Sequence, residues 1–238
     1  MPTTPSAATT VRLPTDGIAW IFLDMGSTLV NEEPSVQAWR QRARTALAEH
    51  GVQLTDEQLA AAWHEVLQEP IRVSITRDLL ARLAPESNLD RGASLWRHDR
   101  EILYPCALSV VRALAQRFRL CVVANQQEGA RDRLRQWGLL PYFSAFALSH
   151  EVGYGKPDRR IFEHALRQAE CRPEEVLMMG DRPDNDIAPA KALGMATLRV
   201  RQGPWKVRGA SSPAEEADAE VTDICNVPSV LDLSPTSI

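Results

Sequence analysis

The hydrophobic pattern of the chain alternates between short apolar runs and longer stretches with helical periodicity. Apolar runs typical of buried strands lie at 19–24, 119–125, 145–150, 175–181 and 195–201, with a further candidate at 219–224. Amphipathic stretches separate the later runs, and strands that alternate with helices predict a parallel sheet with right-handed crossovers. The expected fold class is therefore α/β, a Rossmann-like parallel sheet core with helices on both faces.

The pattern between the first two strands is different, because about seventy residues in succession have helical character. Helices are expected at 35–51 and 54–69, and helical character continues through 71–84 and 92–103. Thr55 followed by Gln58 gives the second of these helices a capping-box pattern. This block predicts a helical cap inserted after the first strand.

These patterns divide the chain into three parts. Residues 1–17 are polar and are expected to form a disordered leader, since they contain no apolar segment of the kind that a secretory signal needs. The α/β core is assigned to 18–32 and 105–238, and the cap to 33–104. Within the core, 201–219 is rich in Gly, Pro, Ser and charge, which predicts a long surface loop.

Composition narrows the function classes. The chain has 238 residues, is 44% hydrophobic and carries a net charge of -4, with its 27 Lys and Arg spread along the sequence. This distribution argues against a nucleic-acid surface, and no run approaches the ~20 apolar residues that span a membrane. The four cysteines lack CxxC spacing, and Cys121 and Cys225 have apolar neighbours typical of small core residues. We therefore expect a reduced, cytoplasmic protein, either a monomer or a homodimer.

Polar residues stand where the predicted strands end. Asp24 follows the first strand, Asn125 follows the second, and Asp181 follows the fourth, with Asp186 close behind. The carboxyl ends of parallel strands meet in one crevice, where three carboxylates would repel one another unless a hard cation such as Mg²⁺ joined them. Lys156, in the loop after the third strand, adds positive charge. A phosphoryl group is the ligand that suits this set of side chains.

Four segments in this order resemble the motifs of the haloacid dehalogenase-like (HAD) hydrolase superfamily. They are "FLDMGSTL", "VVAN", "GKPDRRIF" and "MGDRPDNDIAPAKALGM". The fourth is the most specific of the set, and the order and strand context of all four agree with the family from about residue 18 to residue 232. The helical block resembles the cap of the first subclass of that superfamily.

The resemblance implies a role for each matching residue. Asp24 would be the nucleophile that forms an aspartyl phosphate, and Lys156 would neutralise charge on it and on the phosphoryl group. Asn125, Thr28 and Lys156 would contact or shape the phosphate site. Four groups would hold Mg²⁺: the side chains of Asp24, Asp181 and Asp186 and the backbone carbonyl of Gly26.

Two positions depart from the family pattern. The place of Gly26 usually holds an Asp that protonates the leaving oxygen and then activates water, which is worth typically 10²–10⁴-fold in rate. Ala124 stands where a hydroxyl normally bonds the phosphate, so Gln126 or Gln127 is left as a substitute donor. The stand-in acids to consider in or beside the cap are Glu32, Glu33, His64 and His98, and sequence alone does not distinguish them.

Family members without that Asp suggest other chemistries. The metal-free dehalogenases lack an acidic fourth motif, whereas this chain has "GDRPDND", and the phosphonate-cleaving members need a cap lysine, whereas 33–105 contains none. A signalling receiver domain has its acidic pair early in the chain, and here the pair comes late.

The expected function is thus that of a Mg²⁺-dependent hydrolase, a phosphatase of a small phosphorylated metabolite. The alternative is a weakened or inactive relative that binds a phosphorylated ligand or a partner protein.

Overall fold

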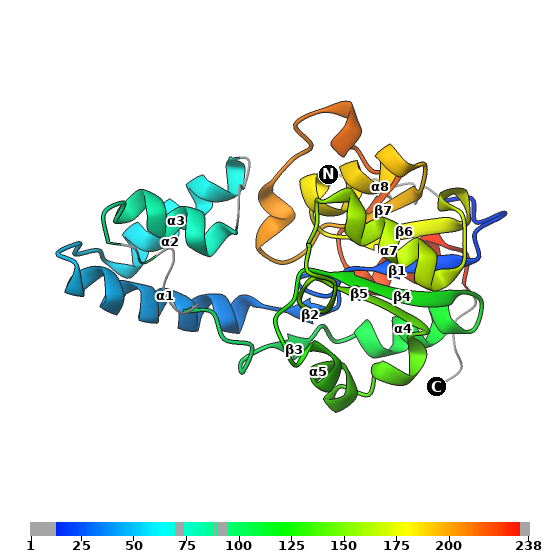
Figure 1. Cartoon of the computed structure of the whole chain (residues 1–238), viewed down its shortest axis with the longest axis horizontal. Coiled ribbons are helices and arrows are strands. Elements are labelled where there is room, and N and C mark those ends of the chain that lie inside the picture. The colour runs from blue at the N-terminus through cyan, green and yellow to red at the C-terminus, as the bar shows by residue number, and fades with distance from the viewer. Residues whose placement is uncertain (1–12, 70–73, 88, 90–94, 234–238) are drawn as a thin grey trace, which may run out of the picture.

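The computed structural model describes residues 13–69, 74–87, 89 and 95–233. Most of the expected leader and parts of the helical segments at 71–84 and 92–103 fall outside these residues. The predicted α/β class is confirmed by a six-stranded parallel sheet in the order β5-β4-β1-β6-β7-β8 (Figure 1). Its strands are β1 (Trp20–Leu23), β4 (Arg119–Ala124), β5 (Ala145–Leu148), β6 (Val176–Gly180), β7 (Ala196–Val200) and β8 (Ala219–Val221).

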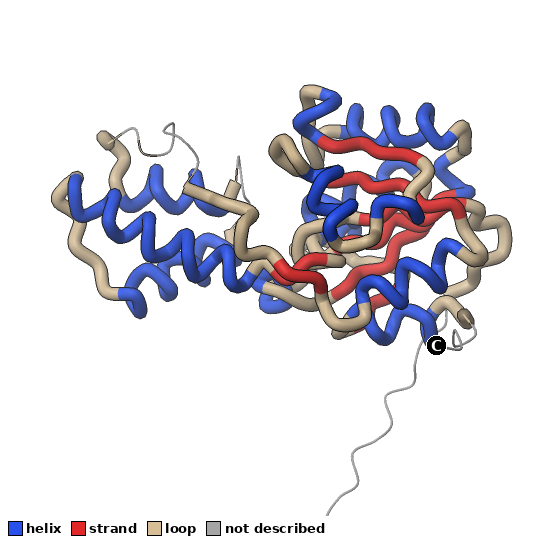
Figure 2. The backbone as a smooth tube through the Cα atoms, turned by 90° about the horizontal axis from the view of Figure 1, so that it is seen from below, coloured by secondary structure: helices blue, strands red, loops and turns tan. Residues whose placement is uncertain are grey.

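Helices cover both faces of this sheet (Figure 2). Alternate residues of β1 point in opposite directions, so that Ile21 and Leu23 join one hydrophobic cluster while Trp20 and Phe22 join the other. The first cluster includes α4 (Ala107–Ala115), α5 (Ala130–Gln136) and α9 (Val227–Val230), and the second includes α7 (Arg159–Ala169) and α8 (Ala188–Leu193). β1 is therefore buried at the centre of the sheet, as its unbroken apolar sequence predicts.

Short helical turns complete the connections around the sheet. They are α6 (Ser149–Val152), η1 (Leu140–Tyr142), η2 (Pro173–Glu175), η3 (Pro183–Ile187), η4 (Pro204–Val207), η5 (Pro213–Glu215) and η6 (Ile224–Asn226). η3 is a π-helix, and it directly precedes α8.

The helical block after β1 packs into a hydrophobic cluster of its own, on the left of Figure 1. It contains α1 (Glu33–Glu49), α2 (Asp56–Gln68) and α3 (Ile75–Leu83). The rings of Trp39 and Trp63 meet at its centre, 5.1 Å apart between centroids. The predicted capping box of α2 is confirmed, since Thr55 and Gln58 bond each other's backbone N–H groups.

The expected helix at 92–103 is wrong for the part that the structure describes. Residues 95–97 and 101 have no regular structure and residues 98–100 form a bend and a turn, while β3 (Ile102–Leu103) pairs antiparallel with β2 (Val30–Asn31). Strands of two residues are too short to produce a periodic signal in the sequence. This small ribbon joins the helical block to the sheet at both of its connections.

Two further expectations need correction. Cys225 is exposed and forms a disulfide with Cys106, with 5.3 Å between their Cα atoms, so it is not a core residue. The partners are 119 residues apart in sequence, a separation at which spacing carries no signal. The segment 201–219 is not only a surface loop, because Trp205 and Arg208 are buried within it. Across the described residues, every helix is too short or too polar to cross a membrane.

Candidate active site

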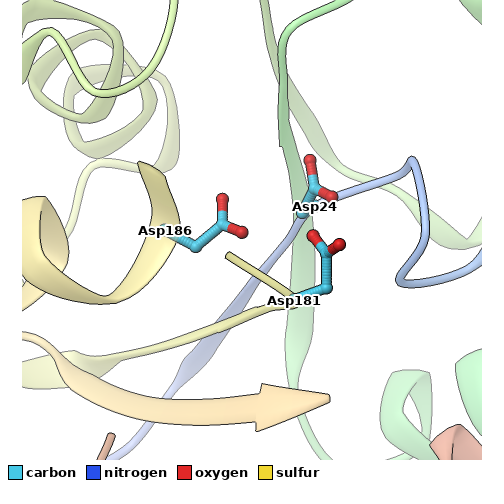
Figure 3. Close-up of side chains that lie close together, drawn as sticks. All are labelled: Asp24, Asp181 and Asp186. Atoms are coloured by element: carbon cyan, nitrogen blue, oxygen red, sulfur yellow. The ribbon is translucent and has the colours of Figure 1, made fainter. Parts of the chain in front are cut away.

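Three carboxylates meet at the carboxyl edge of the sheet (Figure 3). Asp24 follows β1, Asp181 follows the neighbouring strand β6, and Asp186 lies in η3. One oxygen from each lies within 4.8 Å of the others, and all three side chains are buried. A side chain at Gly180 would collide with Asp186, since a Cβ there would lie 2.4 Å from its Cγ. The glycine in the fourth motif therefore makes room for the third carboxylate.

This cluster has the electrostatics of a cation site. Burial, followed by the charges of Asp24 and Asp186, raises the pKa of Asp181 well above its usual value. Burial likewise raises the pKa of Asp186 to about 6, although Lys156 opposes the rise. One oxygen of Asp181, Oδ2, is buried without a hydrogen-bond partner among the described residues. A set of oxygen ligands with an unsatisfied buried member fits Mg²⁺, which would remove the repulsion.

Lys156 lies against the cluster. Its Nζ donates to Oδ1 of Asp24 at 2.6 Å and to Oδ1 of Asp186 at 2.5 Å, and its side chain is almost wholly buried. Burial alone would lower the pKa of Lys156, but the charges of Asp186 and Asp24 raise it above its ordinary value. Lys156 is therefore held as a cation beside Asp24.

Thr28 and Asn125 hold this pair in place. Thr28 Oγ1 donates to Oδ2 of Asp24 at 3.2 Å, on the oxygen that Lys156 leaves free. The Asn125 amide accepts from the Lys156 backbone N–H at 2.6 Å and donates to the Lys156 carbonyl at 2.8 Å. In this arrangement Asn125 positions the backbone of Lys156, and the phosphate contact expected of Asn125 stays a prediction.

The space beside Gly26 is occupied by another acid. A Cβ atom placed on Gly26 would lie 2.7 Å from Oε1 of Glu32. Glu32 precedes α1, and its Oε2 accepts a hydrogen bond from the Ser27 hydroxyl at 2.8 Å. The Glu32 carboxyl group, six residues further along the chain, therefore lies where a side chain at position 26 would lie.

These groups open onto one cavity of about 580 Å³. Its polar end is lined by the carboxylate cluster, Lys156 and Glu32, and its far wall comes from the helical block and includes Trp39, Trp63, Trp96 and His98. Gln126 and Gln127 also line it, and Oε1 of Gln126 accepts from Arg133 at 2.6 Å. The cavity is large enough for a small metabolite, and its lining combines charged groups from the sheet edge with aromatic side chains.

A set of arginines that the motifs did not reveal supports this site. Arg199, at the end of β7, is buried and donates to the backbone carbonyls of Asp181, Trp205 and Arg208. Arg208 donates to the Glu69 carbonyl, at the end of α2, and to Asp184. The loop after β7 thus connects the sheet to the helical block. The sequence signal for this contact was Arg199 itself, a charged residue inside a predicted buried strand.

Comparison with known proteins identifies the family. The sequence profile of the haloacid dehalogenase-like hydrolases matches residues 18–194. The chain belongs to this family. A glyceraldehyde 3-phosphate phosphatase of Methanopyrus kandleri is 29% identical over 201 residues, which are 78% of this chain and 85% of that protein. A phosphoserine phosphatase of Thermus thermophilus is 33% identical over 148 residues, 60% of this chain and 58% of that one.

The fold of the family is shared as well. The HAD-hydrolase YfnB from Bacillus subtilis, solved with bound magnesium, superposes with a TM-score of 0.67 at 20% identity. The superposition covers 91% of this chain and 99% of YfnB. At this identity the likeness supports the Rossmann-like core and the inserted helical block, and the chemistry of this chain depends on its own residues.

Proposed function

We propose that this HAD-like hydrolase is a phosphatase of a small phosphorylated metabolite and that it acts through an aspartyl phosphate on Asp24. The observation that carries the proposal is the contact between Asp24 and Lys156 at 2.6 Å, beside two further buried carboxylates and at the end of a cavity. The phosphatase names of the relatives support the same substrate class. We further propose that residues 33–104 act as the cap that closes over the substrate.

The geometry suggests how the first step would proceed. Lys156 and Thr28 each hold one oxygen of Asp24, which fixes the carboxylate at the sheet edge. An oxygen of Asp24 attacks phosphorus, the bond to the leaving oxygen breaks, and Lys156 stabilises negative charge on the transferring group. Asp24, Asp181, Asp186 and the Gly26 carbonyl would hold Mg²⁺, which supplies positive charge toward the phosphoryl oxygens when bound.

The test is phosphate release from a panel of phosphorylated metabolites, with Mg²⁺ and with EDTA, for the wild type and Asp24→Asn. The variant keeps the shape of the side chain but is a poor nucleophile, so turnover should fall on the order of 10⁴-fold or more. Asp158→Asn is the matched control, because Asp158 is a partly exposed residue that caps α7. Equal phosphate release by the wild type and Asp24→Asn would show that the proposed mechanism is wrong.

A non-catalytic binding role is the second candidate, and Gly26 together with Ala124 favours it. Such a protein would bind Mg²⁺ and a phosphate analogue such as vanadate or beryllofluoride, yet release phosphate from no member of the panel. Isothermal titration with these analogues, run beside the panel, separates the two functions.

The compartment and the assembly also remain proposals. We propose a cytoplasmic protein, monomeric or dimeric, on the grounds of composition and of the small-metabolite chemistry. The Cys106–Cys225 disulfide is unusual for a reducing compartment. Intact mass after alkylation without reductant, on protein taken from its own cells, would show whether these two thiols are paired there.

A further inference from the structure

We propose that Glu32 supplies the general acid and base that position 26 of this chain lacks. The inference rests on the proposed phosphatase function and names one more catalytic residue for it. Its basis is the placement of the Glu32 carboxyl group in the volume that a side chain on Gly26 would fill.

The overlap of the two positions is close. A Cβ on Gly26 would lie 2.7 Å from Oε1, 2.9 Å from Cδ and 2.9 Å from Oε2 of Glu32. The backbone of Gly26 does not itself call for glycine, because Gly26 is not one of the glycines with a positive φ. A side chain at position 26 would therefore meet the Glu32 carboxyl group, whereas the local backbone would accept it.

The carboxyl group of Glu32 is also free to react. Glu32 is the N-cap residue of α1, yet its side chain makes no capping hydrogen bond. Among the residues that the structure describes, only the Ser27 hydroxyl bonds this carboxyl group, and it bonds Oε2. Within the described part of the chain, Oε1 has no hydrogen-bond partner, and Glu32 lines the same cavity as Asp24 and Lys156.

The surroundings of Glu32 favour its protonated form. Burial first, and then the negative charge of Glu101, raise the pKa of Glu32 to about 8. Asp24 adds to the rise, whereas the Ser27 hydrogen bond and the charge of Arg133 oppose it. The role proposed for Glu32 rests on its place beside Gly26, where a carboxyl group can donate a proton in one step and accept one in the next.

The other stand-in acids are placed less well. His64 is exposed on α2 and does not line the cavity, and Glu33 faces Gln37 on the outside of α1. His98 does line the cavity, but its Nδ1 lies 2.5 Å from Oε1 of Glu101, on the side of the helical block. Glu32 is the candidate whose carboxyl group adjoins Gly26.

Glu32 gives up a proton in the first step and regains one in the second. While an oxygen of Asp24 forms a bond to phosphorus, the Glu32 carboxyl transfers its proton to the leaving oxygen, and the product leaves as an alcohol. The Glu32 carboxylate then takes a proton from water as the water oxygen attacks phosphorus. The bond between phosphorus and Asp24 breaks, inorganic phosphate leaves, and Glu32 is protonated again.

Leaving-group dependence tests the first of these steps. With alkyl phosphates, whose leaving oxygen needs a proton, Glu32→Gln should lower kcat by about 10²-fold or more. With p-nitrophenyl phosphate, whose leaving group needs none, the same variant should give a burst of one equivalent of nitrophenolate and then slow turnover. Glu33→Gln, which makes the same substitution one residue further on, should behave as the wild type does.

Moving the carboxyl group from position 32 to position 26 tests whether its location is what matters. Gly26→Asp alone should gain little, because the new Cβ competes with the Glu32 carboxyl for space. The double variant Gly26→Asp, Glu32→Ala should be at least tenfold more active than Glu32→Ala alone. This comparison does not require the Glu32→Gln variant to fold. Mg²⁺ titrations and circular dichroism on each variant report whether the site and the fold are intact.

The outcomes separate this inference from the proposed function. If Asp24→Asn abolishes turnover while Glu32→Gln keeps the wild-type kcat on alkyl phosphates, the role of Glu32 is refuted and the phosphatase stands. If the wild type releases no phosphate and the Gly26→Asp, Glu32→Ala double variant does, Glu32 is not a competent acid. If neither protein turns over any substrate, the proposed function is wrong, and the role of Glu32 is wrong with it.

Discussion

The stability of the metal-free protein should depend on pH through Glu32, and Glu32→Gln should remove that dependence. The folded state holds the pKa of Glu32 at about 8, against an ordinary value of 4.5, because its carboxyl group is buried beside Glu101. A pKa that folding raises means that the native state binds the proton more tightly than the unfolded state does. Stability from this proton is fully present below pH 4.5 and is lost as the pH rises through 8.

The size of the effect follows from the two pKa values. Between pH 5.5 and 8 the native state binds close to one proton more than the unfolded state, and each pKa unit is worth about 1.36 kcal/mol. Integrated over this range with pKa values of 4.5 and about 8, the free energy of unfolding should fall by about 3 kcal/mol from Glu32 alone. Asp181 and Asp186 also have raised pKa values, so the quantity to compare is the difference between wild type and variant.

Urea unfolding in EDTA, followed by tryptophan fluorescence at half-unit steps from pH 5.5 to 8.5, measures this difference. Glutamine carries no charge at any of these values, so the gap between Glu32→Gln and the wild type should change by about 3 kcal/mol in favour of the variant as the pH rises. Glu33→Gln is the control, and its curve should run parallel to that of the wild type. Parallel curves for Glu32→Gln and the wild type would refute the reasoning, because they would mean that folding does not shift the pKa of Glu32.

Three further predictions concern the charges around the site. Lys156→Met leaves two buried carboxylates without their cation, so the metal-free protein should lose about 3–5 kcal/mol of unfolding free energy in urea, and a loss below 1 kcal/mol would contradict this. Below the Asp186 pKa of about 6, Mg²⁺ must displace the proton of Asp186, so calorimetry should show the Mg²⁺ affinity falling about tenfold for each pH unit. The proton released on binding should make the binding heat depend on the buffer. A Mg²⁺ affinity that does not change with pH would contradict this prediction. Arg199→Met leaves three backbone carbonyls without their hydrogen-bond donor and should lower the free energy of unfolding by about 3–5 kcal/mol in the same urea assay. Arg201→Met, at an exposed position two residues away, is the control. Equal losses for the two variants would contradict the prediction.

The sheet and its carboxylate edge could be predicted from the sequence because both depend on local patterns. A short apolar run such as Trp20–Leu23, in a chain where such runs alternate with amphipathic helices, favours the centre of a parallel sheet, and the residue after it then lies at the carboxyl edge. The capping box of Thr55 and Gln58 is local in the same sense. The parallel direction of the strands, which the alternation with helices predicts, places Asp24 and Asp181 at the same edge, and the structure adds that β1 and β6 are neighbours.

The remaining features depend on contacts that no local pattern contains. The disulfide joins residues 119 apart, and Arg199 is buried only because the loop after β7 folds back over it and offers carbonyl groups. The position of Glu32 depends on the turn after β1. Ser27 adopts a φ of 54° there, and the Val30 N–H donates to the Met25 carbonyl at 3.0 Å. This turn brings residue 32 back beside residue 26, whereas an extended chain would separate them by about 20 Å.

Moving the carboxyl group from position 26 to position 32 changes which part of the molecule carries it. A side chain at 26 would belong to the loop after β1, which leaves the sheet at the hydrogen bond from the Asp24 N–H to the Met179 carbonyl and is closed by the bond from the Val30 N–H to the Met25 carbonyl. Glu32 instead begins α1, directly after the β2–β3 ribbon through which the helical block leaves the sheet. A rotation of that block about the ribbon would therefore change the distance between Glu32 and Asp24 to the extent that Glu32 moves with α1. In this chain the geometry for protonating the leaving group is therefore set by the same segment that sets the position of the helical block.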